Sequence, residues 1–449
     1  MKKGKFLKQD LPKKKRSKFL ALNCFTVCLL SVGFLMALPV DSKGSTPPLS
    51  AKSIEKAVQR ALILDDGIPA HLIDVELQRG VVSLTGIVPH LGAKERATLV
   101  TETIKGVNSV VNQIKITPLK RPDAELKSDI LDALQEDPAT ENFRIAVAAN
   151  QGKVVLTGEV SSLALRELAR DIAAGVWGVL SVENHLQITP RVARNDQTIK
   201  EEISRLLEHN VWINENPIEV SVEHGVVTLE GVVGSASEKR RVHRVAMVNG
   251  VKAIQDDGLF TKQWAKGEVR RTRQLAKKTD DEIREFLTAA FRIHPYISLG
   301  HLTVEIQESV VGLYGKVPHL KIKKEAERVV QHTRGVAWVE NFIKVRPKRS
   351  LSDEDIKRKV NRALARNAYV NHRNITAWTF NGKVFLAGTA HSNFEKQEAE
   401  RTIENLKGVI EIESQISVKE TWLWKPDKII TKDVKDELWW SPFIDSEEI

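Results

Sequence analysis

The heptapeptide Gly80-Val-Val-Ser-Leu-Thr-Gly86 sets the architecture of this 449-residue chain, because it returns four more times. Its copies are Gly152-Lys-Val-Val-Leu-Thr-Gly158, Gly225-Val-Val-Thr-Leu-Glu-Gly231, Ser309-Val-Val-Gly-Leu-Tyr-Gly315 and Gly382-Lys-Val-Phe-Leu-Ala-Gly388. The final glycines of successive copies are 72, 73, 84 and 73 residues apart. A period of this length indicates tandem small domains rather than a thin solenoid repeat.

A second glycine, always followed by valine, comes 19 or 20 residues after the first. The ten repeat glycines are therefore Gly86, Gly158, Gly231, Gly315 and Gly388, and then Gly106, Gly178, Gly250, Gly335 and Gly408. Because the two marks keep their register, we expect five complete modules of one design. We place modules 1 to 5 at 48–117, 122–190, 195–260, 278–347 and 351–419, with a basic linker at 261–277.

The hydrophobic period within module 1 predicts the order helix, strand, strand, helix, strand. Apolar residues recur at steps of three and four in Ala51–Leu64, and they alternate with polar residues at 73–77 before Gly80 turns the chain. A second helical stripe ends at Gly106, where glycine readily takes the left-handed cap conformation. A last strand follows at Val107–Ile116. We therefore predict an α+β fold of tandem αββαβ modules, each a three-stranded sheet with two helices on one face.

This pattern, with a strand that ends in V-x-L-x-G and an asparagine in the last strand, resembles the BON domain. The asparagines are Asn112, Asn184 and Asn341, while Asp256 and Ser414 stand at the same place in modules 3 and 5. The resemblance covers nearly all of residues 48–419. It implies a non-enzymatic protein of the bacterial envelope that binds envelope components, including phospholipid surfaces, and serves envelope integrity and osmotic stress tolerance.

The N-terminal region has the composition of an export segment. Residues 1–42 carry +7 of the net charge of +10, and the 22 residues of Phe19–Val40 are uncharged. A basic start before an apolar run predicts translocation of the rest of the chain, either with cleavage near Ser42 or with residues 19–40 kept as an inner-membrane anchor. Both cysteines, Cys24 and Cys28, lie in this run, so the exported part has no disulfide or thiolate chemistry.

The C-terminal segment resembles the start of a sixth module. Residues 427–449 contain Asp-Glu-Leu-Trp-Trp-Ser-Pro-Phe-Ile-Asp, which resembles a first helix and its following turn. A lone helix cannot bury its apolar face, so this partial sixth module must dock on a neighbour, join a partner, touch a membrane or stay exposed. Trp422, Trp424, Trp439 and Trp440 make this tail a candidate contact surface. By contrast, we expect Trp177, Trp338 and Trp378 to be packing residues.

Catalytic and metal-binding patterns are missing from the sequence. It has no Gly-x-Ser-x-Gly, His-Glu-x-x-His, Walker loop or Cys-x-x-Cys motif. His71, His224, His294 and His372 fall around predicted turns, where a solvated side chain is expected. We therefore expect no enzyme activity, no cofactor, no metal and no small-molecule substrate.

Binding is the remaining class, and its first candidate is the basic linker. Lys262, Lys266, Arg270, Arg271 and Arg273 surround Trp264, a composition suited to anionic phospholipid but also to a solvated linker. The alternative is a periplasmic scaffold or spacer that binds envelope proteins. A remoter alternative is KH-like nucleic-acid binding, but Gly175–Gly178, Gly231–Gly234 and Gly312–Gly315 have apolar centres where that loop needs polar ones.

Overall fold

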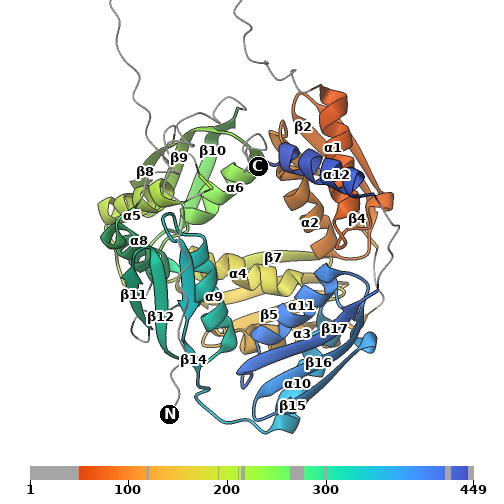
Figure 1. Ribbon diagram of the computed structural model, residues 1–449, viewed down its shortest axis with the longest axis vertical. Coiled ribbons are helices and arrows are strands. Elements are labelled where there is room, and N and C mark those ends of the chain that lie inside the picture. The colour runs from red at the N-terminus through yellow and green to blue at the C-terminus, as the bar shows by residue number, and fades with distance from the viewer. Residues whose placement is uncertain are drawn as a thin grey trace, which may run out of the picture. The chain divides into compact units, whose positions relative to one another are not determined.

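Each module folds as a small mixed sheet with two helices on one face, and the sheet has three strands in modules 2, 3 and 5 and four in modules 1 and 4 (Figure 1). Module 1 contains α1 (Ala51–Leu64), β1 (Ile73–Gln78), β2 (Val81–Val88), α2 (Leu91–Glu102), β3 (Ser109–Asn112) and β4 (Lys115–Ile116). Module 2 contains α3 (Asp123–Glu136), β5 (Ile145–Asn150), β6 (Lys153–Val160), α4 (Leu163–Ala174) and β7 (Ser181–Ile188). Module 3 contains α5 (Asp196–His209), β8 (Ile218–Glu223), β9 (Val226–Val233), α6 (Ala236–Val245) and β10 (Ala253–Thr261).

The second half of the chain repeats this order. Module 4 contains α8 (Asp280–Ile293), β11 (Leu302–Gln307), β12 (Val310–Val317), α9 (Leu320–Gln331), β13 (Trp338–Asn341) and β14 (Lys344–Val345). Module 5 contains α10 (Asp353–Arg366), β15 (Ile375–Phe380), β16 (Lys383–Ala390), α11 (Asn393–Glu404) and β17 (Glu411–Val418), and α12 (Asp427–Trp440) follows it. The computed structural model describes residues 50–117, 121–190, 192–210, 212–213, 218–262, 278–297, 300, 302–419 and 426–442. The predicted export segment therefore lies outside the described residues.

The middle strand of every module lies between the other two. In module 1, β2 pairs antiparallel with β1 and parallel with β3, so that Leu84 lies opposite both Val75 and Asn112. Leu84 and its inward-facing neighbours Val82 and Val88 are buried under α1 and α2. The alternation of apolar and polar residues thus places one face of the sheet against the helices and the other in solvent.

Two of the repeat glycines show why the motif needs glycine. Gly86 has a φ of +127°, and a Cβ there would collide with the carbonyl oxygen of Leu72. Gly106 ends the turn after α2 with a φ of +89°. Side chains rarely adopt such angles. All ten have positive φ, namely Gly86, Gly158, Gly231, Gly315, Gly388, Gly106, Gly178, Gly250, Gly335 and Gly408.

An aspartate at the start of the first helix fixes the β-hairpin. Asn381 and Gly382, the central residues of the module 5 turn, have φ of +50° and +77°, as a type I′ turn requires. Their two backbone N–H groups donate to the Asp353 carboxylate at 2.8 and 2.9 Å. Asp123, Asp196 and Asp280 accept the same pair of bonds in modules 2, 3 and 4. Ala51 stands at this position in module 1.

The late asparagine ties the third strand to the second helix. The Asn112 amide donates to the carbonyl oxygen of Lys94 at 2.6 Å, and its side-chain oxygen accepts from the Ile114 N–H at 3.0 Å. The strand that the sequence predicted as continuous over Val107–Ile116 is observed as β3 and β4. Asn341 forms the same bonds between β13 and β14, and Asn184 forms them within the continuous β7.

First helices pack against one another in three pairs within residues 49–449, which form one compact unit. Between modules 2 and 5, Arg362 of α10 lies 2.8 Å from Asp132 of α3, and Arg366 lies 3.0 Å from Glu136. Between modules 3 and 4, α5 packs on α8. α12 lies beside α1 in the same way, with Arg60 at 3.4 Å from Asp433 (Figure 1). The pairs are therefore module 1 with α12, module 2 with module 5, and module 3 with module 4.

A second contact recurs in all three pairs. The residues just before the second repeat glycine, which we call the corner of a module, contact the end of the partner's first helix. The Trp177 N–H of the module 2 corner donates to the carbonyl oxygen of Arg366 at 2.8 Å, and the Lys105 N–H of the module 1 corner donates to that of Trp440 at 3.0 Å. In the third pair, Asn210 after α5 forms an antiparallel bridge with Thr333 of the module 4 corner. α12 thus docks on module 1 as the first helices of the complete modules dock on one another.

Candidate binding surfaces

Lys262 is the one described member of the predicted linker site. It is exposed just after β10 and lines a groove of about 930 Å³ between modules 1 and 3. The groove also contains Val110, Leu259 and the exposed ring of Phe260. Its walls are joined by Arg240, whose guanidinium lies 2.5 Å from the Glu102 carboxylate. Trp264, Lys266, Arg270, Arg271, Arg273, Trp422 and Trp424 lie outside the described residues.

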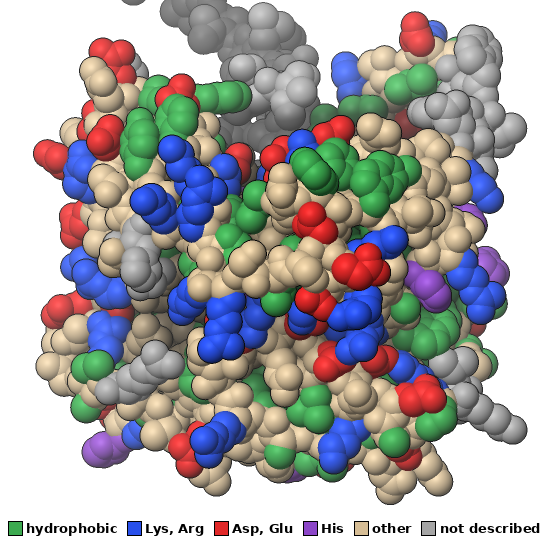
Figure 2. All heavy atoms as spheres, turned by 90° about the horizontal axis from the view of Figure 1, so that it is seen from below, with side chains coloured by type: hydrophobic (Ala, Val, Ile, Leu, Met, Phe, Trp, Pro, Cys, Tyr) green, Lys and Arg blue, Asp and Glu red, His purple; other side chains and the backbone are tan. Residues whose placement is uncertain are grey.

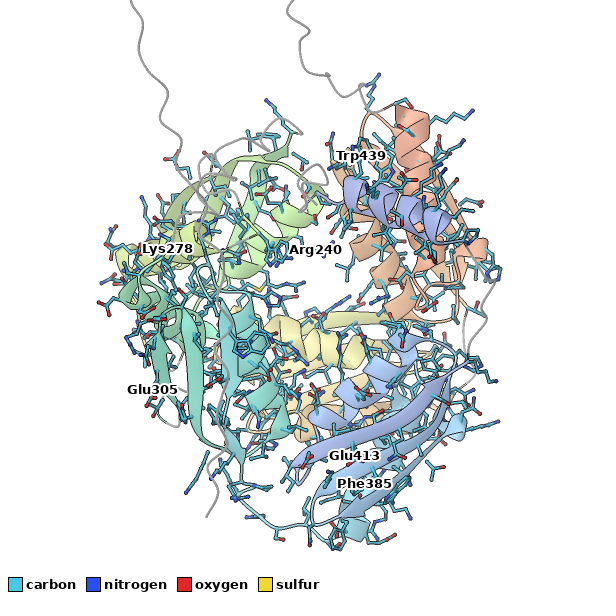
Figure 3. The ribbon with its side chains drawn as sticks, in the orientation of Figure 1. Arg240, Lys278, Glu305, Phe385, Glu413 and Trp439 are labelled. Carbon is cyan, nitrogen blue, oxygen red and sulfur yellow. The ribbon has the colours of Figure 1, made fainter. Side chains whose placement is uncertain are left out.

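Trp439 and Trp440 serve the docking of α12 rather than an open surface. Both are partly buried, and their rings meet edge to face with centroids 4.7 Å apart. Trp440 packs against the core of module 1, while the Lys105 ammonium lies 5.1 Å from the centre of the Trp439 ring. Figure 3 labels Trp439 on α12. Of the alternatives that the sequence left open for this tail, docking on a neighbouring module is the one observed for α12.

The solvent face of the module 4 sheet carries an aromatic and basic row. Trp338, Glu340, Phe342, Lys344 and Arg346 alternate along its third strand with inward-facing residues, and all five are exposed. Trp338 is 67% exposed, so its predicted role as a packing residue is wrong. The Phe342 ring stacks on Tyr314 of β12 with centroids 5.1 Å apart. Aromatic and basic side chains thus share one face.

The cations of this row are available to a ligand. Lys344 of β14 is the register partner of Lys316 on β12, which places two exposed ammonium groups side by side. Among the described residues, no carboxylate forms an ion pair with Lys316, Lys344 or Arg346. Lys344 and Arg346 also line a groove of about 690 Å³ between modules 4 and 5, together with Lys323 and Lys324. The aromatic and basic row consists of Tyr314, Lys316, Trp338, Phe342, Lys344 and Arg346.

The other modules show that this row is not a requirement of the fold. The position of Trp338, three residues after the second glycine, holds Ser109, Ser181, Ala253 and Glu411 in modules 1, 2, 3 and 5. The position of Phe342 holds Gln113, His185 and Gln415 in modules 1, 2 and 5. Sequence reasoning missed the row although the residue alternation from Trp338 to Arg346 was visible, because alternation alone does not tell the buried face from the exposed one.

Module 5 has aromatic residues on its solvent face without free cations. Trp378, which the sequence assigned to packing, is 42% exposed, and its ring stacks on Phe385 with centroids 5.7 Å apart. Lys383 lies 2.9 Å from Glu413 and 3.0 Å from Glu411, and the hydrogen bonds that its ammonium donates to these two carboxylates raise its pKa. Phe385 and Glu413 are neighbours on the sheet (Figure 3). This face is therefore aromatic but not basic.

Two buried histidines mark contacts between modules. His90 caps α2 and its ring lies 4.6 Å from that of Tyr369 in module 5, and burial lowers its pKa to about 4. His319 lies 3.7 Å from Glu141 of module 2, and its pKa is lowered by burial. His294, predicted as a solvated turn residue, is half-buried beside Glu325 of its own module with 22% of its side chain exposed. His90 and His319 are neutral packing groups near pH 7.

The described residues hold no cluster of three or more histidine, cysteine or acidic side chains placed to bind a metal ion. Nor does any described helix combine the length and apolar character needed to cross a membrane. On the face presented in Figure 2, acidic and basic side chains are interspersed. Any attraction for charged partners must therefore come from local groups of side chains, because this face does not carry charge of one sign.

Comparisons with known proteins find two curated relatives and a solved structure. The chain is 31% identical over 142 residues to Osmotically-inducible protein Y of Escherichia coli (strain K12), covering 30% of this chain and 71% of that protein. It is 26% identical over 148 residues to Outer membrane lipoprotein DolP of Haemophilus influenzae, covering 32% of this chain and 76% of that protein. Among solved structures, CdsD, a structural protein of the Type III secretion system of Chlamydia trachomatis, matches with 11% identity and a TM-score of 0.14, over 52% of this chain and 96% of that one.

The family comparison covers well over half of the sequence. The model of the BON domain matches residues 50–118, 122–190, 195–259, 279–347 and 352–420. Each match contains one heptapeptide and one Gly-Val corner. The chain therefore belongs to the BON domain family, as a protein with five tandem copies of that domain.

Proposed function

We propose that this protein is an exported, non-enzymatic component of the bacterial cell envelope that attaches to anionic phospholipid surfaces and supports envelope integrity under osmotic stress. The aromatic and basic row of module 4 is the observation that carries the proposal. The names of the two relatives, one osmotically inducible and one an outer membrane lipoprotein, support the envelope setting. The basic stretch at residues 1–18 and the apolar run after it support export.

The chemistry of the row suits a lipid surface. Tryptophan and tyrosine prefer the boundary between headgroups and hydrocarbon, and Trp338, Tyr314 and Phe342 lie together on one exposed sheet face. Each lysine or arginine near an anionic surface contributes about 1 kcal/mol. Lys316, Lys344 and Arg346 extend the same face, and Lys262 with the linker cations adds a second point of attachment.

Vesicle co-sedimentation tests this proposal. Residues 43–449 should pellet with anionic vesicles and not with neutral ones, and salt should weaken the binding. Lys316→Gln/Lys344→Gln removes two cations, or about 2 kcal/mol, and should weaken binding to anionic vesicles roughly 30-fold. Trp338→Ser/Phe342→Gln should weaken it while leaving the salt dependence unchanged.

Module 5 supplies the matched control. Trp378→Ser/Phe380→Gln removes two exposed aromatic side chains from the same kind of sheet face, and should leave binding unchanged. A variant with a neutralised linker measures how much the linker contributes to vesicle binding. It replaces Lys262, Lys266, Arg270, Arg271 and Arg273 together. Equal binding by the wild type and the Lys316→Gln/Lys344→Gln variant would remove the row from the lipid contact. No pelleting with either vesicle would sink lipid attachment altogether.

The alternative function is a periplasmic scaffold or spacer that binds envelope proteins. The observation that favours it is the set of three module pairs, in which buried charged side chains such as Glu136 and Arg366 hold modules against one another. A partner with exposed carboxylates would use the same cations of module 4. Binding to envelope proteins without any binding to vesicles would support this alternative.

A further inference from the structure

The turn after α12 repeats the turn that follows the first helix of module 4. Ser441-Pro442-Phe443-Ile444 stands after α12 as His294-Pro295-Tyr296-Ile297 stands after α8. The fourth residue of this turn is at most 7% exposed in modules 1 to 5, where it is Ile68, Thr140, Ile213, Ile297 or Val370. The third residue is aromatic in modules 3, 4 and 5 and after α12, where it is Trp212, Tyr296, Tyr369 and Phe443. Phe443 and Ile444 lie outside the described residues.

In modules 4 and 5 this aromatic residue contacts a module outside its own pair. Module 4 is paired with module 3, but the Tyr296 hydroxyl donates to the Asp137 carboxylate of module 2 at 2.9 Å. Module 5 is paired with module 2, but the Tyr369 ring lies 4.6 Å from that of His90 in module 1. A Cβ on Gly92, at the start of α2, would lie 2.7 Å from the Tyr369 hydroxyl oxygen. Each aromatic residue thus reaches the module that precedes its pairing partner in the sequence.

Modules 1, 2 and 3 form a closed ring, because each of them contacts both of the others. Arg170 of module 2 donates to Glu95 of module 1 at 3.0 Å, and Leu163 of module 2 packs in the core of module 3. Arg240 of module 3 lies 2.5 Å from Glu102 of module 1. In this ring the module that precedes module 1 is module 3. The aromatic residue that follows α12, the partner of module 1, is therefore expected to reach module 3.

The equivalent place on module 3 lies between the start of α6 and the residue after α5. Ser237 is the second residue of α6, as Gly92 is of α2, and Asn210 follows α5 as Asp137 follows α3. A buried tyrosine hydroxyl needs an acceptor such as the Asp137 carboxylate. Phe443 has no hydroxyl, and Asn210 carries no carboxylate. The residues on both sides therefore suit an apolar contact.

The groove between modules 1 and 3 connects the end of α12 with this place. Its module 1 wall includes Asn108, three residues after Lys105, whose N–H donates to the carbonyl oxygen of Trp440. Its module 3 wall includes Ala236, the neighbour of Ser237. The turn after α12 thus starts at one wall of the groove, and the expected contact lies at the other.

We propose that Phe443 packs on module 3 between Asn210 and the start of α6. The surface on module 3 receives an aromatic side chain, and its occupant is the chain's own turn after α12. Tyr296 joins the pair of modules 3 and 4 to module 2, and Tyr369 joins the pair of modules 2 and 5 to module 1. Phe443 supplies the third such link, from the pair of module 1 and α12 to module 3. This contact is independent of lipid attachment by module 4.

Photo-crosslinking in the full chain tests the contact. The photoreactive side chain of Phe443→p-benzoylphenylalanine should crosslink, within the same chain, to peptides that contain Asn210 or Ser235–Ser237. Ile444→p-benzoylphenylalanine is the matched control, because the fourth turn residue is buried in its own module, and it should crosslink to α12 instead. Crosslinks from position 443 to module 1 or α12 alone, to a second chain, or to no peptide would overturn the contact. The same crosslinks to module 3 from both positions would overturn it as well.

Hydrogen exchange of the Phe443→Ser variant gives a second readout without a bulky probe. The Glu238 amide in the first turn of α6, which donates to the Ser235 hydroxyl at 3.1 Å, should exchange about tenfold faster when the apolar cover is lost. The amide of Ala93 in α2, which lies beside Tyr369 rather than Phe443, is the control and should not change. Equal exchange of the Glu238 amide in the variant and the wild type would contradict the contact.

Discussion

At the scale of the residue, the module requires glycine at position 86. Strand β2, which contains Gly86, runs so close to the residue before β1 that a Cβ on Gly86 would collide with the carbonyl oxygen of Leu72, and the φ of +127° excludes ordinary side chains. Steric contact and backbone angle therefore demand the same residue. The sequence repeat locates this glycine because both demands recur in each copy.

Gly86→Ala should lower the free energy of unfolding by roughly 3 kcal/mol, because it combines a disallowed φ with a backbone collision. Urea unfolding of the variant and of the wild type measures the change. Gly175→Ala is the control, since Gly175 has a φ of −74° and its Cβ would meet only ordinary contacts at 3.6 Å. A Gly86→Ala variant as stable as Gly175→Ala would contradict the steric account.

Residue patterns located the glycines but misplaced some aromatic and histidine side chains. Trp338 and Trp378 are exposed, contrary to expectation, and His294 is half-buried rather than fully solvated. A strand offers two faces to any alternating pattern, and the neighbours on adjacent strands, which sequence order does not reveal, decide which face is covered. For His294 the cover comes from the packing of other elements around the turn.

At the scale of the element, the bond between a helix start and a hairpin turn stabilises modules 2 to 5, each from its own sequence. Asp353→Ala should cost about 1–2 kcal/mol of unfolding free energy, because two turn N–H groups lose a charged acceptor. Faster hydrogen exchange at the amides of Asn381 and Gly382 would locate the loss in the turn.

Module 1 provides the converse of this substitution. Ala51→Asp should supply the missing carboxylate to the Arg79–Gly80 turn and raise the stability of module 1 by up to about 1 kcal/mol. An unchanged exchange rate at these two turn amides in the variant would show that the geometry of module 1 does not allow the bond.

The helices and strands could be predicted from the sequence better than the contacts that they make. Hydrophobic period and the two glycine marks predicted helix, strand, strand, helix and strand, and the family comparison and the structure confirm that fold. The bond from Asp353 to the turn could not be derived in this way, because a helix-start aspartate also suits a solvated N-terminus. The aromatic and basic row was missed for the reason given for Trp338, while the structure does not describe Trp264 and most of the linker site.

At the scale of the whole molecule, histidines at module contacts predict acid sensitivity. The unfolded chain holds histidine near its ordinary pKa of 6.5, whereas folding lowers that of His90 to about 4. Between these values the unfolded state binds the proton and the folded state does not. The stabilisation is therefore complete above about pH 6.5 and is lost as the pH falls towards 4.

His90→Ser/His319→Ser should reduce this loss, by up to about 3 kcal/mol for His90, when unfolding is followed from pH 7 to pH 4. The serines keep the helix caps, because Ser162, Ser235 and Ser392 cap the second helices of modules 2, 3 and 5. The measured quantity is the slope of the free energy of unfolding against pH, rather than its value at pH 7. Equal slopes in the variant and the wild type would place the acid sensitivity elsewhere.

The pairing of modules has a further consequence for how the chain comes together. The residues that form a hydrogen bond are 126 positions apart in sequence between modules 3 and 4, 230 apart between modules 2 and 5, and 373 apart between module 1 and α12. The pairs are therefore nested in the sequence, one inside the next. During synthesis from the N-terminus, modules 3 and 4 can pair before modules 2 and 5. Module 1 can pair with α12 only after α12 has been made. The delay costs little at equilibrium, since closing 373 rather than 126 residues adds about 1 kcal/mol of chain entropy. Docking of α12 is therefore expected to be the last pairing step in the folding of these modules.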